Sequence, residues 1–194
     1  NVLTLMTVTT IAQAIPIAIS PILTRIYTPE DFGVFALFIG VVGVISVIAT
    51  LTYEQAIILP KYDKYAINIF MLSLILILFT SIFSFIIIFS FKEEILNLLN
   101  NDLLGNWLFF VPITVFFLAL FNLLTNYNNR IKEYKDIAKA TVIKSLVLSI
   151  IQVLIGFLKS GFAGLILGQV LAQIFANFKL AKNILKNKIL LSSV

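Results

Sequence analysis

The sequence predicts an all-α membrane protein, a polytopic helical bundle with six transmembrane helices and a cytoplasmic N-terminus. Of the 194 residues, 60% are hydrophobic and only 12% are charged, whereas soluble domains are about 45–50% apolar and about 25% charged. Six apolar stretches are each long enough to cross a hydrocarbon core of about 30 Å as a helix. The Lys and Arg residues gather on one set of the connections between these stretches, which gives the predicted orientation.

The predicted spans follow the apolar stretches in chain order. They cover residues 1–24, 30–59, 66–91, 107–128, 137–158 and 162–184. The first begins at Asn1, without Met or a basic leader, so we expect a chain cut from something longer and not a cleaved signal peptide. The second has the clearest start, because Thr28 can cap the helix and Pro29 suits its first position. Between the third and fourth spans, apolar and polar residues at helical spacing in 92–106 predict a short amphipathic helix on the outer surface.

The basic residues are distributed very unevenly over the connections. The connections after the second, fourth and sixth spans, with the adjoining helix ends, carry eleven of them: Lys61, Lys64, Arg130, Lys132, Lys135, Lys139, Lys144, Lys179, Lys182, Lys186 and Lys188. The opposite connections carry Arg25, Lys92 and Lys159. Since cytoplasmic loops hold the excess of Lys and Arg, the N-terminus is predicted to be cytoplasmic. The net charge of +5 lies beside hydrophobic spans, so we expect membrane lipids and not nucleic acid as its partner.

The chain contains neither Cys nor His. Disulfides, thiolate chemistry, imidazole acid–base catalysis and the common zinc ligand sets are therefore excluded. No cofactor, metal site or catalytic residue is predicted.

Polar residues recur at helical spacing on five of the spans. The stripes are Thr9, Gln13, Ser20 and Thr24; Ser46, Thr50, Tyr53 and Glu54; Asn122, Thr125, Asn126 and Asn129; Thr141, Ser145, Ser149 and Gln152; and Gln169, Gln173 and Asn177. One interpretation is a bundle around a hydrated cavity, because polar groups inside a membrane face protein or water. The other is that hydroxyls bond their own helix and amides join neighbouring helices.

Small residues and isolated charges add two further predictions. The step from Gly164 to Gly168 and the set Ala36, Gly40 and Gly43 are typical of closely packed helix faces. Glu54 is predicted to pair with Lys144 or Arg130 or to face water, and both a structural ion pair and a coupling-ion or proton site remain open. Snorkelling to the interface accounts for Lys144 and Arg25.

Several segments resemble the polysaccharide-biosynthesis flippases, also called O-antigen translocases, a branch of the multidrug/oligosaccharidyl-lipid/polysaccharide exporter superfamily. The resemblance lies in SPILTRIYTPEDFG at 20–33, in residues 48–54 and 58–61, in NNRIKEYK at 128–135 with 137–139, and in the glycine step at 164–168. Members of this family usually have twelve or more membrane helices in two six-helix lobes. Residues 1–194 therefore resemble a single lobe, the N-terminal half of a longer transporter, whose partner is the C-terminal lobe of the same polypeptide.

The resemblance implies a function and a location. The family moves undecaprenyl-diphosphate-linked oligosaccharide from the cytoplasmic to the outer leaflet of the bacterial inner membrane by alternating access. This transport serves O-antigen, capsule or exopolysaccharide biosynthesis, alongside other polysaccharide-assembly proteins. Such a cargo needs cations for the diphosphate and amides or hydroxyls for the sugar. The candidate cavity residues are Arg25, Arg130, Lys144, Gln13, Asn126, Gln152, Gln169 and Gln173, with Glu54 for coupling or charge balance.

Three other classes of protein are alternatives. A multidrug-extrusion-type exporter would share the bundle, but the stretch TRIYTPEDFG favours the polysaccharide branch. A polymerase or glycosyltransferase should bring a sizeable loop with catalytic carboxylates, and Glu93, Glu94 and Asp102 lie in short outer segments with no basic partner beyond Lys92. A non-transporting membrane scaffold is predicted if the polar stripes prove to be helix contacts.

Overall fold

The computed structural model describes residues 2–50 and 52–186, with side chains from 8 to 49 and from 52 to 182, and these residues form a helical bundle. Its six long helices are α1 (Val2–Ile26), α2 (Pro29–Thr50), α3 (Asp63–Ser90), α5 (Phe110–Arg130), α6 (Tyr134–Phe157) and α7 (Ala163–Lys186). Each includes or belongs to a stretch that is long and apolar enough to cross a membrane. The predicted all-α class and the six spans are confirmed.

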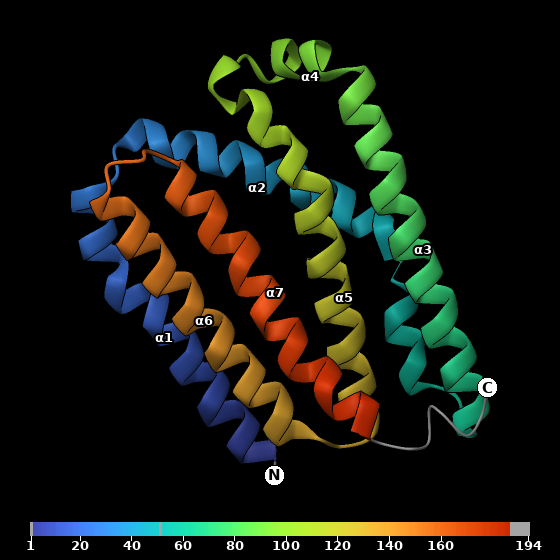
Figure 1. Cartoon of the computed structure of the whole chain (residues 1–194). Coiled ribbons are helices and arrows are strands. Elements are labelled where there is room, and N and C mark those ends of the chain that lie inside the picture. Colours follow the sequence, from blue (N-terminus) through green and yellow to red (C-terminus); the bar gives the residue numbers. More distant parts are fainter. Residues whose placement is uncertain (1, 51, 187–194) are drawn as a thin grey trace.

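The centre of the bundle is formed by α5 and α7. About half of the residues in each of these two spans are buried, against 11% in the span of α1. Helix α5 packs on α7, α3 and α2, while α1 packs mainly on α6. Figure 1 shows α1, α6 and α7 side by side, with α5 between α7 and α3. Helix α1 is therefore attached to the core chiefly through α6.

The second predicted span ends earlier than expected. Helix α2 stops at Thr50, Thr52 adopts a left-handed backbone with φ 60°, and a 3₁₀ helix, η1 (Tyr53–Ile58), follows. The expectation of one helix from 30 to 59 is thus wrong in its last turns. As a result, Glu54 leaves the axis of α2 and is carried by η1, which packs on α3 and α5.

The predicted amphipathic segment before the fourth span contains two short elements. Helix α4 covers Lys92–Leu99, and a second 3₁₀ helix, η2, covers Asp102–Phe109. Lys92 Nζ donates to Asn106 Oδ1 at 2.9 Å, which ties α4 to η2. Both lie across the end of the bundle between α3 and α5 in Figure 1.

The start of α2 has the predicted cap. Thr28 Oγ1 accepts the backbone N–H of Asp31 at 3.2 Å, and Asp31 Oδ2 accepts the backbone N–H of Thr28 at 2.9 Å. This reciprocal pair is a capping box, with Pro29 at the first helical position. Just before it, the hydroxyl of Tyr27 donates to the backbone oxygen of Gln152 at 2.6 Å, which joins the α1–α2 connection to α6.

The two sets of small residues behave differently. A methyl group built on Gly168 would lie 2.6 Å from Gln152 Cγ, and one on Gly164 would meet the Tyr27 hydroxyl, so α6 and α7 pack as closely as predicted. On α2, by contrast, nothing lies within 4 Å of a methyl group built on Gly40 or Gly43. The close packing predicted for this face of α2 is not found within the described chain.

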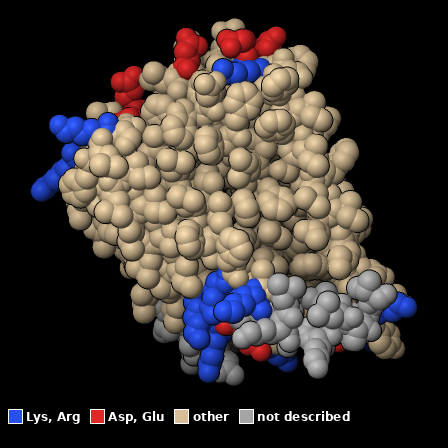
Figure 2. Space-filling model, in the orientation of Figure 1, with Lys and Arg blue, Asp and Glu red and all other residues tan. Residues whose placement is uncertain are grey.

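Most charged residues lie at the two ends of the bundle. Figure 2 shows a largely uncharged face between these ends. We call one of them the basic end, where α1 begins, α3 and α6 begin, and α5 ends. Its described basic side chains include Lys61, Lys64, Arg130, Lys132 and Lys135. The opposite end carries Arg25, Lys92 and Lys159 with Glu30, Asp31, Glu93, Glu94 and Asp102.

Candidate functional site

A polar cleft opens between η1 and α5, in the part of α5 closest to the basic end. Its volume is about 590 Å³. We call it the Glu54 cleft, and it is lined by Glu54, Gln55, Ile58, Leu59, Phe121, Asn122, Thr125 and Asn126. The three polar residues from α5 share one face because they are spaced by three and four positions along the helix.

Two polar atoms of this cleft are buried without a hydrogen-bond partner among the described residues. Glu54 is 6% exposed, and its Oε2 accepts no hydrogen bond. The other atom is Oγ1 of Thr125, which lies on α5. A buried carboxylate is costly unless something compensates its charge. The cleft therefore has oxygen atoms available to a ligand that brings positive charge or hydrogen-bond donors.

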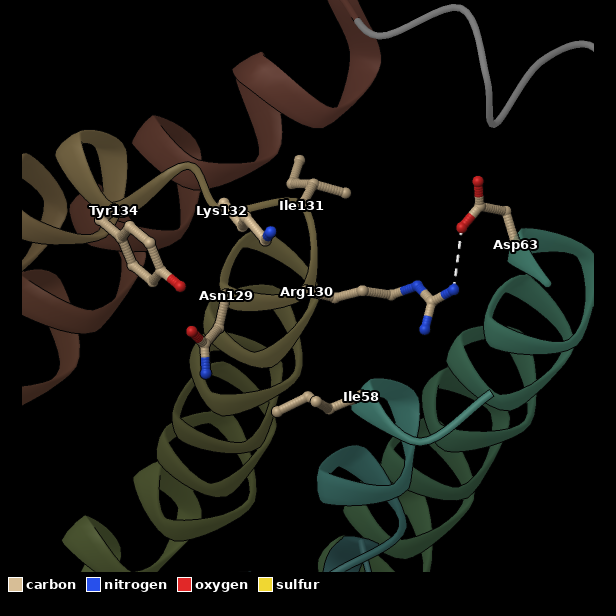
Figure 3. Close-up of a pocket in the computed structure, with 7 residues that line it drawn as sticks. All are labelled: Ile58, Asp63, Asn129, Arg130, Ile131, Lys132 and Tyr134. Carbon is tan, nitrogen blue, oxygen red and sulfur yellow. Dashed lines mark hydrogen bonds and ion pairs between the residues drawn. The ribbon is translucent and has the colours of Figure 1, made fainter. Parts of the chain in front are cut away.

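Arg130, at the end of α5, ties down the segment that carries Glu54. One terminal nitrogen donates to the backbone oxygens of Ile57 at 3.1 Å and Pro60 at 2.7 Å, and the other donates to Asp63 Oδ1 at 2.8 Å. Figure 3 shows the guanidinium pointing toward Asp63. The planar guanidinium can make these bonds at once because its donors diverge in a fixed fork. Arg130 thus bonds the end of η1 and the start of α3 to α5.

The predicted pairing of Glu54 with Arg130 or Lys144 is not found. Arg130 with Asp63 is the single ion pair within the described part of the chain. Lys144, half-buried on α6, places its Nζ 4.7 Å from the centre of the Phe121 ring. A cation over an aromatic face is stabilised by the ring electrons. Since Phe121 lines the Glu54 cleft, Lys144 contacts a wall of the cleft without pairing with its carboxylate.

A second cavity lies beside Arg130 at the basic end. It measures about 550 Å³ and is lined by Ile58, Asp63, Asn129, Arg130, Ile131, Lys132 and Tyr134 (Figure 3). Lys132 is exposed there, with a left-handed backbone at φ 62°. The amide of Asn129 and the hydroxyl of Tyr134 offer hydrogen bonds beside these cations. Because Arg130 is bonded to Asp63 in the same cavity, Lys132 with Asn129 and Tyr134 is the set that could hold an anionic group by charge-assisted bonds.

The amides predicted on α6 and α7 lie at helix contacts. Gln152 is buried, and its Nε2 donates to the backbone oxygen of Leu165 at 3.4 Å. Gln173 is 0% exposed, and Asn177 donates to the backbone oxygen of Phe117 on α5 at 2.7 Å. Gln169 is half-buried on α7. Gln152 and Asn177 therefore join α5, α6 and α7, as the second interpretation of the polar stripes expected, whereas the buried amide nitrogen and oxygen of Gln173 have no hydrogen-bond partner among the described residues.

The remaining predicted residues lie on the outside of α1. Gln13 and Arg25 are both exposed, and Arg25 lies at the end opposite the Glu54 cleft. Of the predicted set, the structure thus brings together Glu54 and Asn126, with Lys144 next to them through Phe121. It does not bring Arg25, Gln13, Gln152, Gln169 or Gln173 to the same place.

The prediction of site residues missed several members of the two cavities. Asn122 and Thr125 belonged to a recognised polar stripe, so their spacing carried the signal. Gln55 and Asp63 gave no such signal, because they meet α5 only through the fold of η1 and the start of α3. No group of three His, Cys, Asp or Glu side chains that could hold a metal occurs among the described residues.

Comparison with known proteins identifies the family. The model of a polysaccharide biosynthesis protein family matches residues 22–185, which covers most of the chain. Comparisons with curated proteins and with solved structures gave no significant match. The match includes all of α2, α3, α5 and α6, and with them both cavities. This chain, a multi-pass helical membrane protein, belongs to the family of polysaccharide biosynthesis proteins.

Proposed function

We propose that this chain forms one lobe of a flippase that moves an undecaprenyl-diphosphate-linked oligosaccharide from the cytoplasmic to the outer leaflet. The observation that carries the proposal is the family match over residues 22–185 of a bundle with six candidate membrane spans. The proposed orientation places the basic end in the cytoplasm, as the excess of Lys and Arg there favours. A C-terminal lobe of the same polypeptide would complete the path by alternating access.

The two cavities at the basic end suit the polar part of such a cargo. The Glu54 cleft presents the amides of Gln55, Asn122 and Asn126, which can bond sugar hydroxyls. The cavity beside Arg130 presents Lys132 and Asn129, which suit a diphosphate. Asn126 is well placed for binding because its Nδ2 donates to the backbone oxygen of Asn122, within its own helix. Among the described residues, its side chain makes no hydrogen bond to another helix.

The test uses a bacterial strain in which the gene for the full protein is replaced by variants. In the double variant Asn122→Ala with Asn126→Ala, surface glycan should fall at least about tenfold, as expected from losing roughly 1.4 kcal/mol of cargo binding. Lipid-linked oligosaccharide should accumulate in the cytoplasmic leaflet. The matched control is Asn68→Ala, an exposed amide near the start of α3 at the same end.

The levels of the protein in the membrane must be equal for the comparison to hold. Unchanged surface glycan in the double variant would contradict the assignment of the cleft. If deletion of the whole gene also left the glycan and its lipid-linked precursor unchanged, the flippase proposal would fail. The non-transporting scaffold, which the helix contacts of α6 and α7 favour, would then be the better account.

A further inference from the structure

The buried face of α7 carries a side-chain amide among apolar residues. This face runs through Ile166, Val170, Gln173, Asn177 and Leu180, which are spaced by four and three positions and are all at most 5% exposed. Gln173 lies near the middle of α7 and is 0% exposed. Within the described part of the chain, neither its Nε2 nor its Oε1 has a hydrogen-bond partner. Such a group is costly inside a membrane protein, because the surrounding lipid supplies no hydrogen bonds.

Asn177, one turn further along, shows that this face of α7 meets α5. Its Nδ2 donates to the backbone oxygen of Phe117 on α5 at 2.7 Å and to the backbone oxygen of Gln173 at 2.8 Å. Its Oδ1 is buried and has no partner in the described chain. Residues four positions apart on a helix are neighbours on its surface, with Cβ atoms about 5–6 Å apart. Three unpaired polar atoms therefore lie on one turn of α7.

This result does not depend on how the two amides are oriented. Exchanging the nitrogen and oxygen of Asn177 would lose both of its bonds, since its Nδ2 faces two carbonyl oxygens. Exchanging those of Gln173 would change nothing, because both of its atoms lack a partner among the described residues. The unpaired atoms need hydrogen-bond donors for the two oxygens and an acceptor for the nitrogen.

We propose that ordered water is bound at the side-chain amide of Gln173, between α5 and α7 in the middle of the membrane span. Water both donates and accepts, whereas a cation could serve only the oxygens and an anion only the nitrogen. Buried waters typically make about three hydrogen bonds to polar groups that are otherwise unsatisfied. This site goes beyond the proposed function and does not depend on it, because neither cavity at the basic end includes Gln173.

The first test detects magnetisation transfer from water to the Gln173 side chain by nuclear magnetic resonance. The purified full-length protein in detergent carries ¹⁵N only in its Gln side chains, and Gln173→Met identifies the Gln173 signal by its loss. We expect a cross-peak between water and the Nε2 protons of Gln173 in a rotating-frame experiment, where transfer through space and proton exchange differ in sign.

The matched control for this measurement is Gln152. It is also buried, but its Nε2 donates to the backbone oxygen of Leu165 at 3.4 Å, so its cross-peak with water should be much weaker. A Gln173 signal that receives no magnetisation through space from water would overturn the proposal. If Gln173→Met does not fold, Gln173→Asn identifies the same signal and keeps an amide at the site.

The second test uses the sign of a change in melting temperature. Met is unbranched, adapts to the available space and has no amide, so Gln173→Met removes the polar atoms with little change of packing. At a dry site, removing unpaired polar atoms would raise the melting temperature. With water bound there, its partners are lost and Asn177 Oδ1 remains buried, so the melting temperature should fall by about 2 °C or more.

Gln169→Met is the control for replacing an amide on α7. Gln169 is half-buried one turn before Gln173, and its replacement should change the melting temperature less. A melting temperature of Gln173→Met equal to or above that of the native protein would overturn the water site. The glycan assay with the Asn122 and Asn126 variants is independent of both measurements, so this site and the flippase proposal can fail separately.

Discussion

Tyr27 shows how a single side chain can fix the position of a peripheral helix. It is buried between α1, α6 and α7, and its hydroxyl donates to the backbone oxygen of Gln152 at 2.6 Å. Burial, with a smaller contribution from the charge of Asp31, raises the pKa of Tyr27 to about 12 from its usual value of 10.0. The folded protein therefore favours the neutral phenol more strongly than the unfolded chain does.

We expect the stability of the native protein to fall between about pH 10 and pH 12 because of this residue. A raised pKa in the folded state contributes stability that is fully present below the unfolded pKa and is lost as the pH rises through the folded one. Tyr27→Phe should lower stability by about 1 kcal/mol at pH 8, since it removes one hydrogen bond. The difference in melting temperature between the native protein and Tyr27→Phe should then shrink from pH 9 to pH 12. A difference that stays constant over this range would contradict the prediction.

Arg130 marks the limit of what the sequence predicts at the scale of residues. Its cationic character and its place at the basic end were predictable, but two of its partners are backbone oxygens 70 and 73 positions away. Backbone oxygens carry no sequence signal, so nothing in the pattern distinguishes a structural Arg130 from one that binds cargo. Glu54 was recognised as unusual because carboxylates inside a span are rare. Its distance from Lys144 and Arg130 depended on the fold.

At the scale of elements, the close packing of α6 on α7 depends on Gly164 and Gly168. Gly40 on α2 serves as a comparison, because it has no close neighbour. A methyl group at Gly168 would lie 2.6 Å from Gln152 Cγ and 3.4 Å from the backbone oxygen of Leu148. Nothing lies within 4 Å of the equivalent position at Gly40 on α2. The same substitution therefore tests close packing at one site and intrinsic helix preference at the other.

We expect Gly168→Ala to destabilise the protein by about 1–3 kcal/mol, the usual cost of overpacking a close contact. Gly40→Ala should be neutral or stabilising by up to about 1 kcal/mol, because Ala favours a helix more than Gly does. The melting temperatures of the two variants in the same detergent, with unfolding monitored by size-exclusion chromatography, measure the difference in stability. Equal melting temperatures for the two variants would show that the α6–α7 contact is looser than described.

The spans themselves were predictable because the length and composition of an apolar stretch nearly decide whether it crosses a membrane. The residue at which α2 ends was not predictable from the sequence. The residues after Thr50 remain apolar enough to extend a helix, and the 3₁₀ conformation of η1 is held by Arg130 from α5, a tertiary contact. The amphipathic segment before α5 was recognised from its pattern, although its division into α4 and η2 was not.

At the scale of the whole molecule, the charge distribution predicts how the bundle lies in the membrane. Residues 1–194 contain no Cys, so within them a single introduced Cys reports the position of one residue without a background. Asn97 on α4 and Lys135 at the start of α6 are exposed at opposite ends. In intact spheroplasts, a membrane-impermeant maleimide should label Asn97→Cys, whereas Lys135→Cys should react only after permeabilisation. The reverse pattern would contradict a cytoplasmic N-terminus.

The attachment of α1 through α6 also has a consequence for how the protein is made. The backbone oxygen that accepts the Tyr27 hydroxyl belongs to Gln152, 125 positions later in the chain. At about 5–20 residues per second, α1 waits roughly 6–25 s in the membrane before its partner helix has been synthesised. During that interval the polar stripe with Gln13 has only lipid, the insertion machinery or the early helices to contact. The order of synthesis therefore makes α6 the helix whose arrival completes the fold of the N-terminal segment.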